Sequence, residues 1–282
     1  MGNFDQLLEE FDLLHKKKEI SQAMKSAIGI RAMQESEENI PIGTSKLGGL
    51  PDLPPHFEFP KYHHGYLSFL GQINLSEAKP FDVDHILPDQ GILYFFYDII
   101  EQPWGFEKED NGSFKVLYFK GDLSELTRTD YPEPIDDYSP LKAFKVKFYQ
   151  HQTVSEDPEG LELNEEESEN FLEFRSQAMQ PSKDDHLLPA HYMLGEPLNI
   201  QNDVFEEMVY YSNENKYGTN GWQSNHREIR ARSKELVLLF QMDSDDDLDV
   251  MWGDAGILYF CIHKDDLKNK RFEKVGFILQ CY

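Results

Sequence analysis

Five aspartates near residue 250 form the densest chemical signal in the sequence. Asp243, Asp245, Asp247, Asp249 and Asp254 fall at positions 1, 3, 5, 7 and 12 of a calcium-loop register, and hard cations favour such oxygen clusters. A leucine replaces the glycine that the sharp turn of this loop needs, and the last position holds aspartate in place of the longer glutamate. We therefore interpret the segment as a solvated acidic hairpin loop. Asp243, Asp245 and Asp254 remain candidate cation ligands.

A second metal hypothesis rests on histidines beside proline-rich turns, with two aspartates further along the chain. Transition metals use such ligands, but no standard ligand spacing connects these residues. Exposed loop histidines are the favoured interpretation, and we expect no bound cofactor. The residues of this hypothesis are His56, His63, His64, Asp82, Asp84 and His85.

Cys261 and His263 are two residues apart on a predicted strand, so both side chains lie on the same face. A cysteine–histidine nucleophile needs its thiol in a polar, accessible niche. The apolar run around Cys261 predicts burial instead. With Cys281 as the second of only two cysteines, a disulfide framework is excluded, and we interpret both as reduced thiols.

Loop and strand-end residues supply the candidates for binding a ligand or partner. Glycines of a rigid turn allow close backbone approach, glutamines at strand ends cap neighbouring loops, and tryptophans on loops can stack on a ligand. Structural roles are the commoner explanation for each type. The candidates are Gly48, Gly49, Gln72, Trp104, Gln241 and Trp252.

The amino-acid composition limits the kinds of partner that the protein can bind. The chain has 282 residues and a formal net charge of -25, which repels phosphate backbones and anionic membranes. The only short basic run is Lys16 to Lys18. The same charge favours a basic protein partner or a cation. No secretory leader or membrane-spanning apolar run is evident, so we expect a cytoplasmic protein.

The apolar periodicity predicts an α+β fold. A helical stripe begins at Phe4, and a second apolar set from Ile20 to about Met33 predicts a continuing N-terminal helix. Apolar or alternating runs then predict strands, and a capping-box pattern at Asp203 predicts a short helix. The predicted strand ranges are 66–75, 91–97, 114–119, 142–150, 236–242, 256–262 and 275–281. The predicted organisation is a helical segment (1–35), a first β-rich half (36–150), an acidic connecting segment with a helix (151–185) and a second β-rich half (186–282), in one compact unit.

The strand groups of the two predicted halves echo one another. Residues 69–74 and 238–243 each end in glutamine, an apolar residue, and asparagine or aspartate. Gly-Ile-Leu-Tyr-Phe follows in each half, at 91–95 and 256–260, and an apolar strand comes next. This order predicts two related antiparallel β-meanders that arose by internal duplication, with equivalent loops across a shared cleft.

The same segments carry a resemblance to a known family. The segments KLGGLPDLP (46–54), FLGQINL (69–75), HYMLGEPLNIQ (191–201), LLFQMDSD (238–245) and WGDAGILYF (252–260), together with residues 87–97, resemble the YwqG-like family, a domain family of unknown function. The resemblance spans about residue 40 to the end. It implies a bacterial-type soluble α+β domain and transfers no catalytic residues.

No short catalytic signature accompanies these features, because the sequence holds no P-loop, G-x-S-x-G, H-E-x-x-H or paired C-x-x-C motif. We therefore expect a non-catalytic binding or interaction protein. One version is an acidic neutraliser of a basic partner, such as an immunity-type protein against a toxin. The alternative is a cation-dependent hydrolase with carboxylates in the cleft between the two halves.

Overall fold

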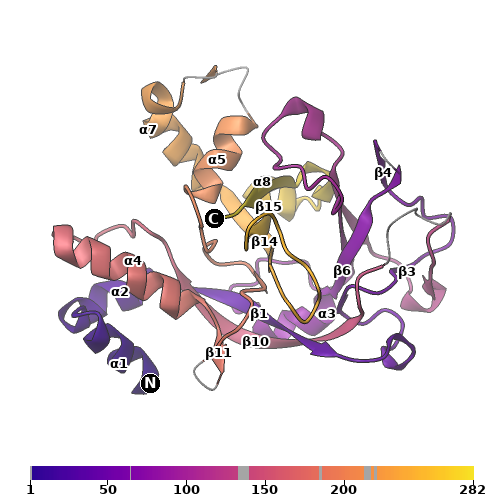
Figure 1. Ribbon diagram of the computed structural model, residues 1–282, viewed down its shortest axis with the longest axis horizontal. Helices are drawn as coiled ribbons and strands as arrows, with labels where there is room; N and C mark the ends of the chain where they lie inside the picture. The colour runs from indigo at the N-terminus through magenta and orange to yellow at the C-terminus, as the bar shows by residue number, and fades with distance from the viewer. Residues whose placement is uncertain (1, 64, 133–139, 184–185, 213–216, 219–220) are drawn as a thin grey trace.

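A large antiparallel sheet organises the chain in the computed structural model (Figure 1), which describes all residues except 1, 64, 133–139, 184–185, 213–216 and 219–220. Its order is β16-β15-β14-β13-β1-β10-β2-β6-β7-β8. The strands are β1 (Met24–Gln34), β2 (Lys46–Leu47), β6 (Ser68–Asn74), β7 (Ile92–Tyr97), β8 (Phe114–Phe119), β10 (Phe144–Val154), β13 (Tyr192–Met193), β14 (Leu236–Asp243), β15 (Ile257–His263) and β16 (Gly276–Gln280).

Three small two-stranded sheets accompany the large one. They pair β3 (Asp52–Leu53) with β9 (Thr127–Arg128), β4 (Lys61–Tyr62) with β5 (Gly65–Tyr66), and β11 (Ser182–Lys183) with β12 (His186–Leu187). The α-helices are α1 (Gly2–Glu10), α2 (Lys17–Ala23), α3 (Leu75–Ala78), α4 (Glu165–Met179), α5 (Val204–Tyr211), α7 (Trp222–Ser233) and α8 (Lys264–Lys268). The 3₁₀ turns are η1 (Leu14–Lys16), η2 (Glu37–Asn39), η3 (Lys79–Phe81), η4 (Lys108–Asp110), η5 (Leu123–Glu125) and η6 (Phe272–Lys274).

The strand order has the same pattern when read from either end. Two long strands, β1 and β10, pair in the middle. On one side lie β2, β6, β7 and β8, which we call the first arm. On the other side lie β13, β14, β15 and β16, which we call the second arm. β1 borders the second arm and β10 borders the first, so each long strand joins the arm that is more distant in sequence.

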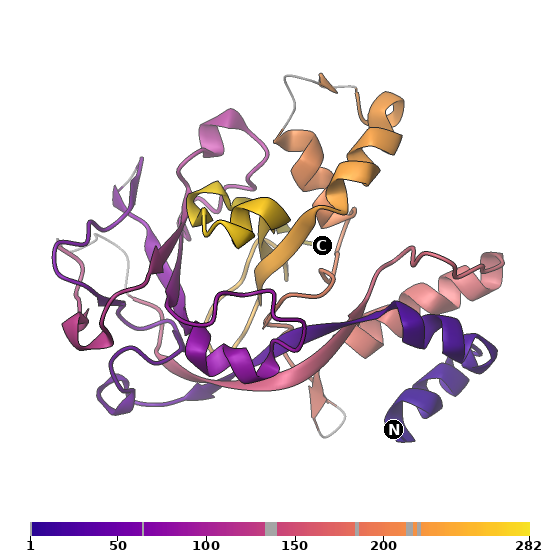
Figure 2. The ribbon, with the colours of Figure 1, turned by 180° about the vertical axis from the view of Figure 1, so that it is seen from behind.

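The sheet curls into a nearly closed barrel, and this brings the inner faces of the two arms together (Figure 2). The ring centroid of Phe95 in the first arm lies 4.8 Å from that of Phe240 and 5.2 Å from that of Phe260 in the second. Strand residues alternate between faces, so this inner set forms one core cluster. Burial of such large rings, together with the aliphatic residues of the cluster, stabilises the contact between the arms.

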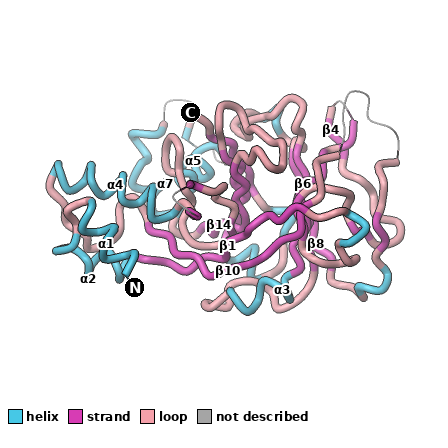
Figure 3. Tube along the Cα trace, turned by 60° about the horizontal axis from the view of Figure 1, so that its bottom comes forward, coloured by secondary structure: helices cyan, strands magenta, loops and turns pink. Residues whose placement is uncertain are grey.

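Helices cover the other face of the second arm and of the central strands. α1, α2 and α4 lie side by side at one end of the β1–β10 ribbon (Figure 3), where Phe4 packs edge-on against Phe174 at 6.0 Å. A second core cluster joins these helices to Tyr192 and Tyr259. α4 begins at a capping box in which Asn164 and Glu167 satisfy each other's backbone amides. No helix within the described ranges is long and apolar enough to cross a bilayer.

Most predicted elements are confirmed as mixed helix and antiparallel sheet, but the N-terminal helix is shorter than predicted. The expected continuation from Ile20 to Met33 is wrong, because α2 ends at Ala23 and residues 24–34 form the central strand β1. Ile28 and Ile30 alternate into the core, and pairing with β10 over the full length of β1 overrides the helical spacing.

Candidate functional site

A groove of about 590 Å³ lies beside the acidic loop that follows β14, residues 243–256. Its apolar lining is Leu187, Leu188, Pro189, Leu198, Ile200, Met251 and Ile257, and its acidic lining is Asp243, Asp245, Asp246 and Asp247. Among the described residues that line the groove, none is lysine, arginine or histidine. The groove therefore combines an apolar wall with an acidic rim.

The acidic loop is held by a buried histidine. His191 is 2% exposed, and its Nδ1 accepts the backbone N–H of Asp243 at 3.0 Å. Nε2 is then the protonated nitrogen, and it donates to Asp245 Oδ2 at 3.0 Å. Burial acts to raise the pKa of Asp245, but the bonds from His191, Leu248 and Asp247 outweigh it and lower that pKa. Burial raises the pKa of Asp243.

These bonds place the three cation candidates in separate roles. Asp243 Oδ2 accepts the backbone N–H of Ala190 at 2.8 Å, while Asp245 caps its own loop. Asp254 is exposed, and its carbonyl accepts from Tyr282. Across the described part of the chain, no three acidic, histidine or cysteine side chains form a group that holds a metal ion. The exposed carboxylates of Asp246 and Asp247 face solvent instead.

The candidate glutamines are buried at equivalent positions of the two arms and do not meet in a cleft. The side-chain oxygen of Gln72 accepts the backbone N–H of Asp52 at 2.9 Å, and that of Gln241 accepts the N–H of Leu198 at 3.1 Å. Each side-chain amide also donates to a loop carbonyl at 2.8 Å. Both glutamines therefore fix the loop of their own arm, as buried polar groups commonly do.

Two tyrosines repeat this equivalence. Tyr94 donates to the carbonyl of Asp52 at 2.7 Å, and Tyr259 donates to the carbonyl of Leu198 at 2.5 Å. Burial raises the pKa of both phenols well above the ordinary value. They stay neutral donors, and each locks the loop that its neighbouring glutamine holds.

The candidate glycines serve close packing. Gly48 and Gly49 have φ of 61° and 68°, in the left-handed region. A Cβ on Gly48 would lie 2.0 Å from the carbonyl oxygen of Lys142, and one on Gly49 would lie 2.4 Å from Glu37 Oε1. Leu194 and Gly195 hold the matching positions in the second arm, with φ of 63° and 72°. The turn conformation is thus common to both arms.

A buried ionic network beneath this turn was not predicted from the sequence. Lys46 is fully buried, donates to the carbonyl of Leu50, and lies 3.1 Å from Glu37 Oε1 and 3.5 Å from Asp52 Oδ1. Arg128 Nε donates to Asp52 Oδ1 at 2.9 Å. Burial lowers the pKa of Lys46, while the charge of Asp52 opposes this effect. The sequence signal for this network was the presence of two single charged residues, Lys46 and Asp52, in the otherwise uncharged segment 46–54.

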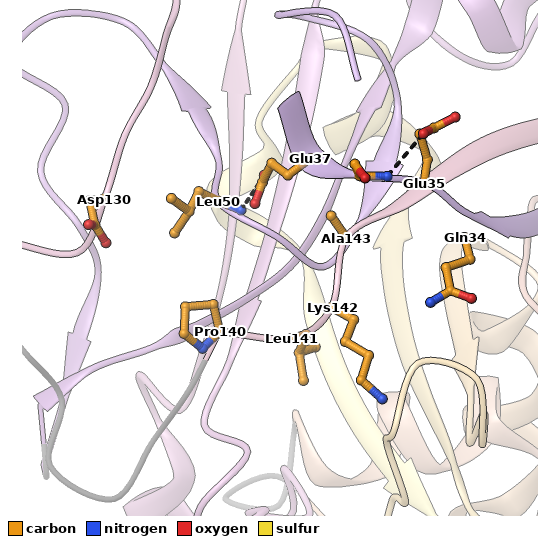
Figure 4. A pocket seen from close by; sticks show the side chains of 10 residues that line it. Gln34, Glu35, Glu37, Leu50, Asp130, Pro140, Leu141, Lys142 and Ala143 are labelled. Atoms are coloured by element: carbon orange, nitrogen blue, oxygen red, sulfur yellow. Dashed lines mark hydrogen bonds between the residues drawn. The ribbon is translucent and has the colours of Figure 1, made fainter. Parts of the chain in front are cut away.

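A larger hollow of about 850 Å³ lies beside this network (Figure 4). Glu35, Glu37, Asp130 and Lys142 contribute charged side chains of both signs. Glu37 is already engaged, since it accepts the backbone N–H of Leu50 at 2.8 Å. This mixed lining gives no preference for one charge class of ligand, in contrast to the acidic groove.

The two candidate tryptophans have different environments. Trp252 is buried in the core, 6.0 Å from the ring of Tyr97, and its Nε1 donates to the carbonyl of Asp243 at 3.2 Å. Trp104 is 40% exposed on the loop after β7. Its carbonyl accepts from the backbone N–H of Leu279 at 3.0 Å, which covers the edge of β16. Only Trp104 offers a surface for stacking.

The loop of Trp104 also holds the acidic loop. Gln102 donates through Nε2 to the carbonyl of Met251 at 3.0 Å and accepts the backbone N–H of Gly253 at 2.8 Å. Its φ of 48° is unusual for a residue with a side chain. One amide thereby connects the first arm to the rim of the groove in the second.

Among the described residues, the remaining candidates form no group suited to catalysis or metal binding. Cys261 and Cys281 are buried, and burial raises the pKa of Cys261 well above its ordinary value. His263 caps α8 through Nδ1. Asp82 accepts the backbone amides of Ile86 and Leu87, and His64 lies outside the described residues.

Comparison with known proteins identifies the family and no more. No curated protein matches the chain. The family model DUF1963, described as a domain of unknown function, matches residues 45–281. That match includes both arms, the acidic loop and the groove residues except Tyr282, but starts after β1. The chain therefore belongs to the DUF1963 family, a domain of unknown function.

Proposed function

We propose that the protein is a non-catalytic binding protein for a basic protein partner, and that the acidic groove is its contact site. The observation that carries the proposal is the lining of the groove, which holds four aspartates and no cationic residue among the described ones. A lysine or arginine side chain fits such a surface, because its aliphatic stem packs on apolar groups while its charge meets carboxylates.

Exposure at the rim supports the same partner class. Leu187 is 62% exposed, Met251 51% and Tyr282 83%, and all three line the groove. Exposed apolar side chains next to free carboxylates match a partner segment that alternates basic and apolar residues. The net charge of -25 adds long-range attraction, which speeds encounter with a basic protein.

We extend the proposal to the subfamily, the cellular location and the biological role of the protein. We place the chain in the YwqG-like branch of its family and in the cytoplasm, with an immunity-type role against a basic toxin as the specific version. Internal duplication is also proposed. It is supported by the paired positions Gln72 and Gln241, and Tyr94 and Tyr259, which make equivalent bonds. No observation at the groove favours the hydrolase alternative, so we do not propose it.

The first test is binding of a labelled peptide of alternating lysine and leucine, followed by fluorescence anisotropy at low and moderate salt. We expect binding by the wild type that weakens with salt. The double variant Asp246→Asn/Asp247→Asn removes two exposed charges at the groove. It should weaken binding roughly two- to thirtyfold, because each of the two exposed charge pairs contributes about 0.2–1 kcal/mol.

The matched control is Glu9→Gln/Glu10→Gln, which removes the same charge from exposed positions on α1. It should change the affinity less than twofold. Equal weakening by both double variants would mean that only net charge matters and would overturn the groove as the contact site. A native partner captured by wild type and control, and lost with the groove variant, would extend the result to the cell.

A further inference from the structure

Two buried polar groups lack a partner in the described structure, and their residues lie opposite each other at the end of the β7–β8 pair. Asp98 is 7% exposed and Ser113 is fully buried. Asp98 Oδ2 and Ser113 Oγ have no hydrogen-bond partner among the described residues, and no other buried side-chain polar atom there shares this condition. Unpaired buried polar atoms are costly, so each needs a ligand.

The strand register places both groups at one point. β7 and β8 pair Tyr97 with Phe114, and the next pair is closed by the bond from Asp98 N to Ser113 O at 2.8 Å. Residues directly opposite in an antiparallel pair project to the same face, with Cβ atoms about 5 Å apart. A single small species between the two side chains therefore reaches both oxygens.

The charge around this point is negative. Asp98 Oδ1 accepts the backbone amides of Ile100 and Glu101, at 3.0 and 3.4 Å. Burial raises the pKa of Tyr62, and the carboxylates of Asp110, Glu101 and Asp98 raise it further. The one basic residue of loop 98–113, Lys108, is exposed. A positive ligand is favoured over a neutral one in this field.

We propose that Asp98 and Ser113 hold a monovalent hard cation, sodium or potassium. One carboxylate balances one positive charge, and oxygen ligands suit a hard ion. A divalent ion is disfavoured because a single carboxylate balances only half of its charge. The site is separate from the groove, but Gln102 of the same loop holds Met251 and Gly253 of the acidic loop. A bound cation would therefore also restrain one rim of the groove.

The test is thermal unfolding in sodium chloride, potassium chloride and choline chloride at equal ionic strength. Choline screens charge equally but is too large for the site. We expect the wild type to melt about 3 °C higher in sodium or potassium chloride than in choline chloride. Asp98→Asn keeps the acceptor for Ile100 and Glu101 and should lose this difference. Ser113→Ala should reduce it.

The matched control is Asp82→Asn, which changes an equally buried aspartate whose two oxygens already accept backbone amides. It should keep the full difference between salts. Anomalous diffraction from wild-type crystals soaked in rubidium chloride gives a readout that needs no variant, with a peak expected between Asp98 and Ser113. Equal melting in all three salts, or no such peak, would assign the position to water and overturn the proposal.

Discussion

Lys46 in β2 of the first arm and Tyr192 in β13 of the second hold equivalent strand positions before the turn and make equivalent bonds with different chemistry. Lys46 donates to the carbonyl of Leu50, and Tyr192 donates to the carbonyl of Glu196 at 2.7 Å. Two residues after Leu50, the first arm has Asp52, which lies between Lys46 and Arg128. Two residues after Glu196, the second arm has the apolar residue Leu198 at the equivalent position.

The difference separates what the fold requires from what each arm adds. Both arms keep the turn, the glutamine and the tyrosine, so the backbone geometry is the common requirement. The first arm pairs its buried carboxylate with cations. The second arm keeps its acidic groove free of basic lining residues in the described structure. The second arm, with the exposed carboxylates of Asp246 and Asp247 at its groove, is the one suited to meet a basic partner.

The largest expected effect comes from giving the first arm the residue of the second. Asp52→Leu removes the fully buried carboxylate that lies against buried Lys46 and half-buried Arg128, and leaves these cations with Glu37. Breaking a buried ion pair in this way costs about 3–5 kcal/mol. Urea unfolding measures the change in free energy. Asp84→Leu, at an exposed aspartate, should change it by less than about 0.5 kcal/mol. A loss under 1 kcal/mol for Asp52→Leu would mean that the cations find other partners.

Removing the shared glutamines tests whether the arms are energetically alike. Gln72→Leu and Gln241→Leu each leave a loop amide and a loop carbonyl unpaired, so each should cost about 2–4 kcal/mol in urea unfolding. Similar losses of stability in the two variants would show that the two arms depend equally on this glutamine. A loss confined to Gln72→Leu would show that only the charged arm depends on this bond.

Asp203, which caps α5 in the second part of the chain, provides a pH test. Burial raises its pKa to about 6 from an ordinary 3.8. Between these values the folded state holds a proton that the unfolded state releases, so its contribution to stability is present at low pH and lost as pH rises through about 6. Asp203→Asn keeps a capping oxygen and should stabilise by about 1–3 kcal/mol at pH 7.5.

The same variant should differ much less from wild type at pH 4, where the folded carboxyl is protonated and pH is only just above the ordinary pKa of 3.8 that applies to the unfolded chain. Urea unfolding from pH 4 to 7.5 follows this trend. Asp122→Asn, at an exposed cap whose pKa is lowered by its bonds to Ser124, should give no such gain at neutral pH. A pH-independent effect of Asp203→Asn would contradict the assigned cause.

The smallest expected effect concerns the contact between the arms. Gln102→Ala removes two bonds to the acidic loop and should cost about 0.5–1.5 kcal/mol. Hydrogen exchange at the Gly253 amide should become faster, whereas Gln90→Ala, at an exposed glutamine, should leave it unchanged. Unchanged exchange with Gln102→Ala would show that the acidic loop holds its shape alone.

Local pattern was sufficient to predict most strands and the capped helices. Alternation in residues 142–150 and the apolar runs near 92 and 257 each mark elements whose burial the residues themselves encode. The central strand β1 was predicted as helix because its partner strands lie far away in sequence, at 144–154 and 192–193. The residues of β1 themselves do not indicate this pairing. Pairing across that separation decided between helix and strand.

Site prediction was limited in the same physical way. The acidic loop was visible as a run of aspartates, but its anchor His191 lies some fifty residues earlier and was not singled out. Lys46, Glu37 and Arg128 are likewise brought together only by folding. Asp98 and Ser113 are ordinary residues in sequence. Their interest arises because a strand pair leaves both without protein partners.

The crossed arrangement of the two long strands has a consequence for how the chain is made. β1 leaves the ribosome early, yet the strands on both its sides end at Val154 and Met193. At about 5–20 residues per second, this central strand waits on the order of ten seconds for its neighbours. During synthesis its Ile28 and Ile30 are exposed, so the nascent chain has a long interval in which chaperones, or another copy, can reach them first.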